Sequence, residues 1–280
     1  MRRILILLMC LNPGAGLFAQ HAADHSALQA RIQELGQART DVAKDSLSGL
    51  VKEALRALLD ADDAFTAAFD DIKLSRVDAP DGKFRIFTWN VPHADGSHLF
   101  EGLLVVKERA RRVLFDLRDR TPQIPSPTTV ELGPDKWYGA IYYAVVPTAK
   151  GGKTYYTLLG WKGHSNIETR KVIDVLSFKG GTPRFGAPLF GDGKLKHQRE
   201  VFGFSFQASM SLRWDDLNKR IVLDHLSPMR QDLDGQTAFY GPDLSYDAYV
   251  WDRDHWSFQR DIDARDEGPK KPWNSPPKDR

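Results

Sequence analysis

The sequence predicts an α+β protein that is mainly β: amino-terminal amphipathic helices followed by an antiparallel β-meander or barrel, or a sandwich-like domain. Apolar residues recur at spacings of three and four before residue 74 and at a spacing of two after residue 78. Beyond that point, short apolar segments are separated by Gly, Pro, Asn and Asp, as in antiparallel strands joined by tight turns. A partial propeller is also compatible with this pattern, but no fixed repeat length favours a regular one.

Residues 1–20 have the order of a secretory signal peptide. Two arginines precede a short apolar run, and small residues follow near Ala19. The run is shorter than the roughly 20 apolar residues that span a bilayer. Cleavage near Ala19 would remove Cys10, the only cysteine, so we expect an exported protein, periplasmic or extracellular, without disulfides. The alternatives are a buried amino-terminal strand and a lipid anchor on Cys10, although Met9 is large for the position before a lipidated cysteine.

The charge of the chain is nearly balanced. Its 280 residues include 39 Lys and Arg against 37 Asp and Glu, and loss of the leader's two arginines would lower the basic count to 37. A net charge near zero provides no general attraction for nucleic acid, which we therefore exclude as a partner. The rest of the chain has no long apolar run, so we expect no transmembrane segment in the mature protein.

Residues 24–74 form the expected helical segment. Apolar residues at 28, 32 and 35 mark a short amphipathic helix that weakens at Gly36. A longer pattern runs from Leu47 to Ile72, which predicts one long helix, bent near the acidic residues that begin at Asp60. We expect its apolar face to pack on the β-domain or on the first helix. The alternative is a partner-binding or coiled-coil seam.

The β-domain is expected over residues 78–264, followed by an unpacked tail at 265–280. Strands are predicted at 84–90, 99–107, 111–119, 137–146, 155–161, 167–178, 220–226, 249–251 and 256–262. Residues 121–128 contain three prolines and are expected to form a long crossing loop. Ser165 and Glu168 have the spacing of a helical capping box, so the favoured prediction for 167–178 is a strand entered through one helical turn.

The strongest prediction is a single strand over residues 200–214, followed by a polar turn and a return strand. Apolar side chains occupy every second position from 202 to 214, and small or polar side chains lie between them. Successive strand residues point to opposite faces of a sheet. Phe204 and Phe206 are therefore predicted to be buried in one core, with Gln207 on the other face.

The familiar catalytic and cofactor motifs do not fit this chain. GGKT at 151–154 resembles the end of a phosphate-binding loop, but Pro147 stands where the first glycine is required and a strand follows. The Asp-Gly pairs at 191–194 and 232–235 lack the later acidic ligand of a calcium loop. The histidines lack HExxH or HxH spacing, and no GxSxG elbow is present. We expect no cofactor and no metal, and the sequence identifies no catalytic residue.

Three segments, at 161–166, 224–228 and 240–249, combine aromatic side chains with carboxylate, amide or imidazole groups. Such a mixture suits a polar ligand such as a sugar, which stacks on one group and hydrogen-bonds to the others. The alternative is that the aromatic residues form the rim of the core, with their polar ends in water. The candidate ligand-binding residues are Trp161, His164, Asn166, Asp224, His225, Tyr240, Asp243, Tyr246 and Asp247.

Residues 84–256 contain five distinctive segments: YYTLLGWKGHSN, KVIDVLSF, PRFGAPLF, SMSLRWDDLNKRIVLDHLSP and YGPDLSYDAY. Together they resemble a group of uncharacterised secreted proteins from Bacteroidota bacteria. The resemblance implies bacterial export and a shared β-architecture. It implies no activity, substrate or catalytic residue.

Two classes of function follow from these observations. The favoured class is a non-enzymatic binding or structural module of the cell envelope, whose partner is a polar small molecule, a glycan or an envelope protein. The alternative is a secreted or periplasmic hydrolase acting on glycans or peptides, with Asp224 and His225 as the first pair to consider. Adjacent strand residues point to opposite faces, so these two side chains are not expected to serve one site unless the strand has ended.

Overall fold

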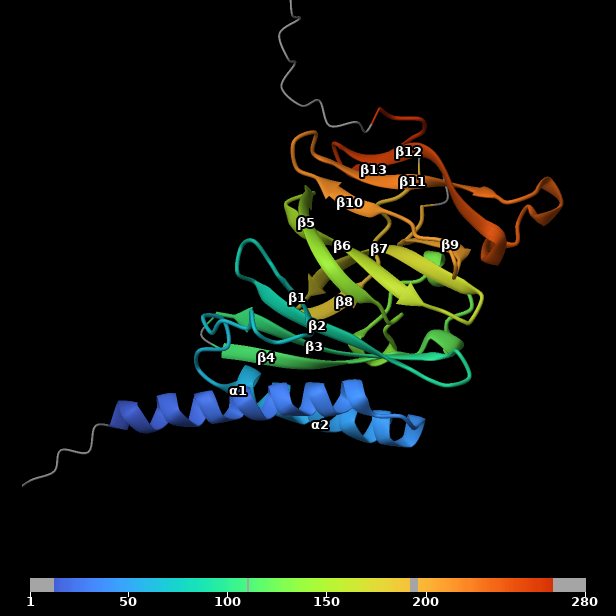
Figure 1. Cartoon of the computed structure of the whole chain (residues 1–280). Helices are drawn as coiled ribbons and strands as arrows, with labels where there is room; N and C mark the ends of the chain where they lie inside the picture. The colour runs from blue at the N-terminus through green and yellow to red at the C-terminus, as the bar shows by residue number, and fades with distance from the viewer. Residues whose placement is uncertain (1–12, 110, 192–195, 264–280) are drawn as a thin grey trace, which may run out of the picture.

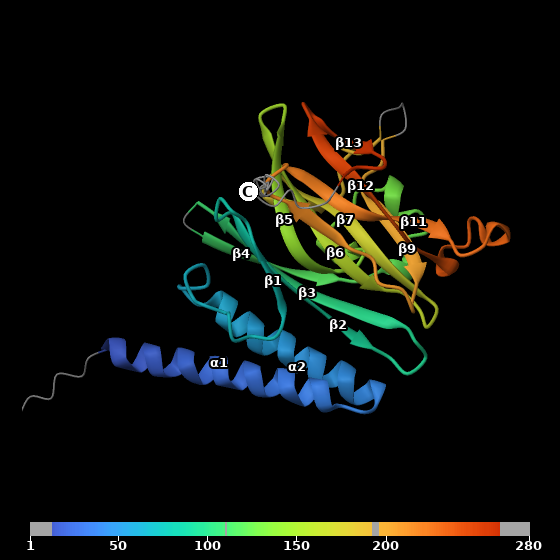
Figure 2. The same ribbon diagram turned by 45° about the horizontal axis from the view of Figure 1, so that its top comes forward.

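The helices and sheets of the protein stack in four layers. The computed structural model describes residues 13–109, 111–191 and 196–263. Helices α1 (Pro13–Gln37) and α2 (Asp41–Asp60) cover one face of the first sheet, and two further sheets lie beyond it, as Figure 1 and Figure 2 show. Strands account for 47% of the residues and helices for 21%, so the prediction of a mainly β protein with two leading helices is confirmed.

The first sheet is an antiparallel meander with the strand order β1-β2-β3-β4. Its strands are β1 (Ser75–Asp78), β2 (Phe84–Pro92), β3 (His98–Glu108) and β4 (Arg111–Arg118). The β2–β3 turn contains Gly96 at a φ of 85°, a left-handed conformation that glycine adopts without strain. An Asp-Gly pair is common in tight hairpin turns for this reason.

The second sheet lies at the centre of the stack. It contains β5 (Ile141–Lys150), β6 (Lys153–Gly163), β7 (Glu168–Lys179), β8 (Thr182–Phe185) and β9 (Glu200–Ser205). Both β8 and β9 pair with the same side of β7, at different points along it. The strand prediction for 167–178 is confirmed, but no helical turn precedes it. The Ser165 hydroxyl instead accepts hydrogen bonds from the amides of Ile167 and Glu168 in a simple turn.

The third sheet contains β10 (Leu212–Asp215), β11 (Arg220–Pro228), β12 (Tyr240–Asp252) and β13 (His255–Gln259) in that order. Short 3-10 turns, η4 (Gln231–Leu233) and η5 (Thr237–Phe239), lie between β11 and β12. Within the described residues the three sheets do not close on themselves, so the barrel alternative is wrong. The sheets bury their faces by stacking, as the layers of a sandwich do.

The single strand expected over 200–214 is also wrong. The chain leaves the second sheet after β9, which pairs with β7, and enters the third sheet at β10, which pairs with β11. Phe204 precedes this crossing and is buried, whereas Phe206 lies within it and is 56% exposed. The alternation of apolar residues therefore continues across a change of sheet.

Helix α2 is shorter than its apolar pattern predicts. It begins after the N-cap Thr40 and ends at Asp60, and residues 61–74 continue as turns and extended chain. Phe69 and Ile72 nevertheless pack in the same cluster as the helices and the facing side chains of the first sheet. The spacing thus reflects contact with the sheet rather than helix length, and the expected packing on the β-domain is confirmed.

Three apolar clusters fill the three spaces between the layers. Each contains side chains from both of its facing layers, which is how a stack of this kind buries its apolar surface. In order from the helices outward, representative buried residues are Leu28, Val51, Phe87 and Trp89; then Phe84, Leu104, Trp137 and Phe185; then Leu159, Ile173, Phe204, Leu212 and Trp256.

The proline-rich segment 121–128 begins the connection between the first and second sheets, as expected. The connection contains three 3-10 turns, η1 (Thr121–Gln123), η2 (Pro127–Thr129) and η3 (Pro134–Lys136), and it ends at the buried Trp137. Proline lacks the N–H that a central strand needs, which explains the absence of a strand over 121–128.

The ends of the chain are only partly described. Most of the expected signal peptide, with Cys10, and the expected tail at 265–280 lie outside the described residues. Among the described helices, none has both the length and the apolar composition required to cross a membrane.

A pair of phenylalanine variants tests the crossing between β9 and β10. Phe204→Ala is expected to lower the free energy of unfolding by about 3–5 kcal/mol, because the side chain is buried between two sheets. Phe206→Ala should change it by well under about 1 kcal/mol, because its side chain is largely in solvent. Urea unfolding of both variants measures the difference. Large and equal losses would contradict the break between the two strands.

Candidate functional site

A pocket of about 440 Å³ lies between the carboxyl end of β6 and the proline-rich connection. Its polar lining comes from the start of β3, the connection, and the facing ends of β6 and β7. Its apolar lining comes from the connection's prolines and Ile124. The polar residues are Ser97, His98, Asp119, Thr121, Tyr138, Lys162, His164 and Arg170.

Lys162 is the buried charged group of this pocket. Its side chain is only 2% exposed, and its ammonium donates hydrogen bonds to Thr121 Oγ1 at 2.9 Å and to the Gly139 carbonyl at 2.7 Å. Its Nζ also lies 4.3 Å from the ring centre of Phe100 and 4.7 Å from that of Tyr138. Two oxygens and two aromatic faces therefore hold the cation in one place.

Burial lowers the pKa of Lys162 to about 8, and the nearby carboxylate of Asp119 opposes this shift. The amine is therefore protonated at neutral pH. Asp119 Oδ2 lies 4.0 Å from the ammonium, and the carboxylate accepts shorter hydrogen bonds from the Thr121 amide and hydroxyl. Asp119 is therefore the carboxylate nearest to Lys162, although the two groups make no direct hydrogen bond at this distance.

Two histidines complete the polar lining near this cation. Burial lowers the pKa of both His98 and His164, and the positive charges of Lys162 and Arg170, respectively, lower the two pKa values further. Both rings are therefore neutral at pH 7, and the Glu168 carboxylate opposes the effect of Arg170 on the pKa of His164. His98 Nδ1 accepts a hydrogen bond of 2.8 Å from the Asn90 amide, which leaves Nε2 as the N–H donor of that ring.

Gly163 leaves room for the ring of His98 beside β6. A Cβ added at this position would lie 2.4 Å from the His98 ring, so glycine alone fits there without displacing the imidazole. Trp161 packs against the same ring with a centroid distance of 5.9 Å. Asn166 donates a hydrogen bond of 3.3 Å to the Asp95 carbonyl in the β2–β3 turn. Trp161 and Asn166 therefore support the pocket from outside.

Arg170 lines another side of the pocket. Its guanidinium donates to the Tyr138 hydroxyl at 3.0 Å and to Glu168 Oε1 at 2.7 Å. Arginine carries five N–H donors, and these two contacts use two of them. The remaining donors give Arg170 the capacity to bind an acceptor group in the pocket.

A second polar cluster surrounds His225 in the third sheet. The Nδ1 atom of His225 lies 2.8 Å from Oδ2 of the buried Asp247, whose Oδ1 accepts a bond from the Asp261 amide. This carboxylate orients the imidazole and leaves Nε2 for another partner. The adjacent Asp224 does not pair with His225; it accepts a hydrogen bond of 2.8 Å from the Ser211 amide.

A bulge in β12 places three residues, 243–245, opposite His225 in the β11–β12 ladder. Leu244 has a φ of 74°, which is uncommon for a bulky residue. Hydrogen bonds from Ser245 lower the pKa of Asp243, and the positive charge of a protonated His225 adds to this effect. Bulges and left-handed residues occur often at functional sites, so this feature marks the His225 cluster as a second candidate.

The nine residues predicted from the sequence fall into two groups rather than one site. His164 lines the pocket beside Lys162, and Trp161 and Asn166 pack next to it. His225, Asp243 and Asp247 form the second cluster, beside which lie Asp224 and the partly exposed Tyr246. Tyr240 belongs to neither group, because its hydroxyl bonds to Asp234 and to the Gly235 amide.

The sequence reasoning missed Lys162, His98, Asp119 and Arg170. The alternation of residues along β6 could have indicated that Lys162 is buried. Tyr156 and Leu158 face the core between the first and second sheets, and position 162 continues the same face. A lysine on a core-facing position indicates a buried charge, which proteins retain only with partners.

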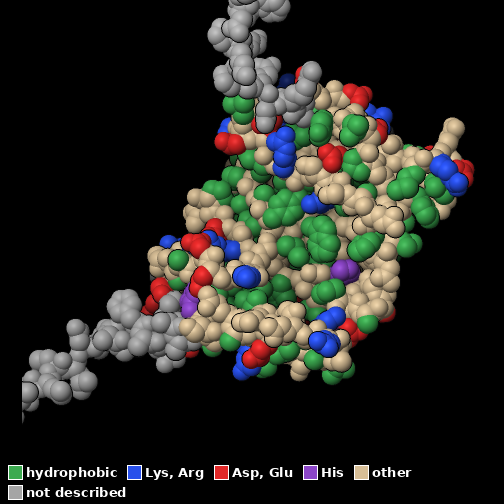
Figure 3. Space-filling view, viewed as in Figure 1, with side chains coloured by type: hydrophobic (Ala, Val, Ile, Leu, Met, Phe, Trp, Pro, Cys, Tyr) green, Lys and Arg blue, Asp and Glu red, His purple; other side chains and the backbone are tan. Residues whose placement is uncertain are grey.

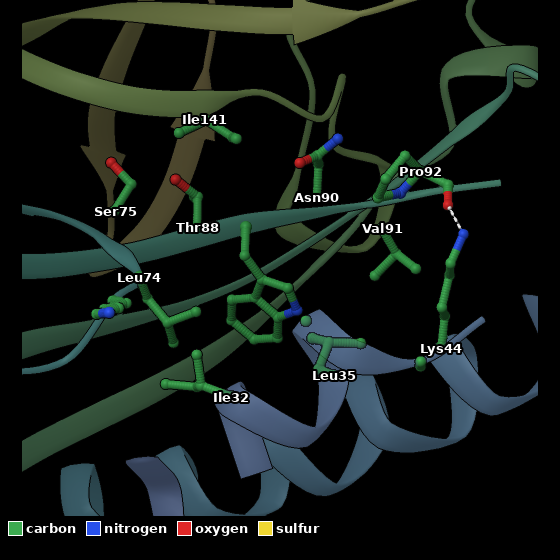
Figure 4. Close-up of a pocket in the computed structure, with 14 residues that line it drawn as sticks. Ile32, Leu35, Lys44, Leu74, Ser75, Thr88, Asn90, Val91, Pro92 and Ile141 are labelled. Carbon is green, nitrogen blue, oxygen red and sulfur yellow. Dashed lines mark hydrogen bonds between the residues drawn. The ribbon is translucent and has the colours of Figure 1, made fainter. Parts of the chain in front are cut away.

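A further cleft of about 350 Å³ lies between α1 and β2. Figure 4 shows Ile32 and Leu35 of α1 on one side of it and Val91 of β2 on the other. At one end, Lys44 donates a hydrogen bond of 2.6 Å to the Pro92 carbonyl. Lys44 is therefore used by the fold, and the described residues that line the cleft include no carboxylate or histidine.

Comparisons with known proteins do not identify the site. No family model, no curated protein and no solved structure matches the chain. The resemblance to secreted Bacteroidota proteins therefore stays a prediction. Within the part of the chain that the structure describes, no three His, Cys, Asp or Glu side chains are grouped closely enough to hold a metal ion.

Replacement of Lys162 should change how stability depends on pH. Folding lowers the pKa of this amine to about 8, so between pH 8 and the ordinary value of 10.5 the unfolded chain binds more protons than the folded one. The free energy of unfolding contributed by this group therefore rises with pH across that window, by on the order of 3 kcal/mol. Urea unfolding of wild type and Lys162→Met from pH 7.5 to 10.5 isolates this contribution. A constant difference between the two proteins would contradict it.

Proposed function

We propose that the protein is an exported, non-enzymatic binding module of the bacterial cell envelope, whose pocket beside Lys162 holds a small polar ligand that carries a carboxylate. The observation that carries this proposal is the presence of two cations, one of them buried, in the lining of one pocket. Lys162 and Arg170 both line it, beside His98 and His164, whose pKa values are lowered by burial first and by these charges second. The leader-like order of residues 1–20 supports export.

The contacts of Lys162 favour binding over catalysis. A nucleophilic lysine needs an amine that is unprotonated and free to approach the substrate. Here the ammonium is protonated at neutral pH and directs hydrogen bonds to Thr121 and Gly139. The group therefore acts as a fixed positive charge beneath the pocket.

The lining indicates the chemistry of the ligand. Arginine binds planar carboxylates well, because its parallel N–H groups match the two oxygens. Pro122, Ile124 and Pro125 add apolar surface to the lining of the same pocket. A carboxylate on a compact, partly apolar body, such as an acidic sugar, satisfies both the donors and the apolar surface of the pocket.

Glucuronate and glucose form a matched pair of probes, because they differ in the carboxylate. We expect isothermal titration calorimetry to detect glucuronate binding and no glucose binding in this pocket. The affinity should rise as the solution is acidified from pH 7, because His98 and His164 gain positive charge once the pH falls to their pKa values, which lie below the ordinary value for histidine. Equal affinity for both sugars, or an affinity that falls with acidification, would contradict the proposal.

Arg170→Gln tests the same pocket by removal of one charge. The variant keeps an amide donor and should weaken glucuronate binding about tenfold, the effect of one charge-assisted hydrogen bond. Arg213→Gln, at an exposed position of β10, is the control and should bind as wild type does. Unchanged glucuronate binding by Arg170→Gln would contradict the proposal that this pocket binds the carboxylate.

A hydrolase is the second candidate function, and the His225 cluster supports it. Asp247 orients the imidazole of His225 as the carboxylate of a catalytic triad orients its histidine. Asp224 bonds instead to the Ser211 amide, in agreement with the expectation that adjacent strand residues do not serve one site. Among the described residues, no serine, threonine or cysteine is hydrogen-bonded to His225, so the supported role is a general base that activates water.

Hydrolysis of 4-nitrophenyl esters and glycosides tests this second candidate. Asp247→Asn and His225→Ala should each lower any activity by about 10²–10⁴-fold, the usual contribution of a general base. Asp224→Asn should retain most of it, because that carboxylate does not contact His225. Activity that survives in both His225→Ala and Asp247→Asn would exclude this cluster as a catalytic site.

A further inference from the structure

A groove of about 620 Å³ runs along β5 where the second and third sheets meet. Both β5 and β10 are the outermost strands of their sheets. Figure 3 shows hydrophobic side chains gathered over the middle of this face, where Figure 1 places these two strands. The groove shares no residue with the pocket beside Lys162 or with the His225 cluster.

Tryptophans form one wall of this groove. Trp214 and Trp251 are half-buried, and both rest edge-on against the fully buried Trp256, at centroid distances of 6.4 and 5.2 Å and interplanar angles of 81° and 73°. Trp256 is itself fixed by a hydrogen bond of 3.0 Å from its indole to Thr157 Oγ1. The two outer rings therefore form rigid apolar surfaces that remain partly open to solvent.

The opposite wall contains a polar atom that the fold does not use. Thr148 Oγ1 is buried, and it has no hydrogen-bond partner among the described residues. Buried hydroxyls almost always have a partner, and one without it calls for a specific explanation. Thr148 lines the groove on β5, facing the sheet that carries the tryptophans. A rotation of the Thr148 side chain about χ1 would bring this hydroxyl to the surface of the groove, where a ligand hydroxyl would supply the missing hydrogen bond.

The charges at the groove are paired. Lys219 lies 2.7 Å from Asp216, and Lys150 lies 3.2 Å from Asp254. Asp216 also accepts a hydrogen bond of 3.2 Å from the Trp214 indole. Because each cation has its own carboxylate, the groove has no charge that selects an ionic ligand. The pocket beside Lys162 differs, because Arg170 keeps N–H donors that its contacts with Tyr138 and Glu168 do not use.

The edge of β5 is poorly suited to the addition of a peptide strand. Pro147 lies in the middle of the segment 145–149 that lines the groove, and it has no N–H to donate. Prolines on edge strands block this kind of pairing. A ligand that hydrogen-bonds to the protein's side-chain hydroxyl and carboxylate groups therefore fits the groove better than a peptide that extends the sheet.

We propose that this groove binds a neutral pyranose residue of a glycan. The apolar face of the sugar ring stacks on the exposed part of Trp251, and its hydroxyls hydrogen-bond to Thr148 Oγ1 and to the Asp216 carboxylate. Aromatic surface beside a few polar groups is the usual composition of such a site. The proposal rests on residues separate from those of the proposed carboxylate pocket, so either can fail alone.

The experiment uses the full chain with three neutral probes: cellohexaose, mannohexaose and chitohexaose. Tryptophan fluorescence and isothermal titration calorimetry should show saturable binding of at least one of them. Trp251→Ala should weaken that binding more than tenfold, because it removes the stacking surface. Phe239→Ala is the matched control, since it removes an aromatic ring that is 41% exposed outside the groove, and it should bind as wild type does.

Thr148→Val separates a binding role from a structural one. Valine has nearly the same shape as threonine but lacks the unpaired hydroxyl, so the thermal midpoint should stay the same or rise. The affinity for the oligosaccharide should nevertheless fall about tenfold, the effect of one lost hydrogen bond. Lower affinity without lower stability supports a direct contact with the ligand.

Three results would overturn the proposal. One is the absence of saturable binding for all three oligosaccharides. Another is binding that Trp251→Ala and Thr148→Val leave unchanged. The last is binding of an extended peptide, sensitive to Trp251→Ala, in the absence of any oligosaccharide binding, which would assign the groove to strand addition. Simultaneous binding of glucuronate and the oligosaccharide, without competition, would support two separate sites.

Discussion

The buried ion pair between Arg199 and Asp174 is the interaction on which the rest of the structure depends. Both side chains are fully buried, and Arg199 Nε lies 3.0 Å from Asp174 Oδ1. Asp174 comes from the middle of β7, and Arg199 comes from the segment just before β9. Loss of either partner would leave an uncompensated charge in the interior, at a cost that exceeds the net stabilisation of the pair. Because Arg199 must reach Asp174, the chain after β8 returns to β7. Strand β9 then begins at Glu200, directly after Arg199, and pairs with β7.

The same pair anchors the connection between the first two sheets, and so the pocket beside Lys162. The guanidinium donates to three backbone carbonyls, those of Pro127, Val130 and Phe185. The carboxylate accepts from the hydroxyl of Tyr142, which in turn accepts from the indole of Trp137. Gly139 lies between these two aromatic residues, and its carbonyl accepts a hydrogen bond from Lys162. The Arg199–Asp174 pair thus helps to position the Gly139 carbonyl oxygen, which accepts a hydrogen bond from the buried ammonium of Lys162.

Local patterns predict those parts of the fold in which neighbours in the sequence are also neighbours in space. The β5–β6 hairpin is one example, because its turn at Gly151 and Gly152 requires positive φ angles and its strands alternate on both sides. The ligand-like segment 161–166 is another, since His164 does line a pocket. The hydrogen-bond partners of Lys162, by contrast, lie 41 and 23 residues away. No spacing within β6 reports contacts of that range, so the centre of the pocket could not be predicted.

The alternation of apolar and polar residues predicts that a side chain is buried, but it does not predict the sheet to which that residue belongs. Phe204 and Leu212 have the same parity in the sequence and pack in the same cluster, although one belongs to the second sheet and the other to the third. The core between two facing sheets accepts side chains from both, so the pattern continues through the break between β9 and β10. His225 shows the same limit at a candidate site. Its carboxylate partner, Asp247, comes from the next strand, near a bulge. The sequence of β11 alone predicts neither the register between the two strands nor the bulge.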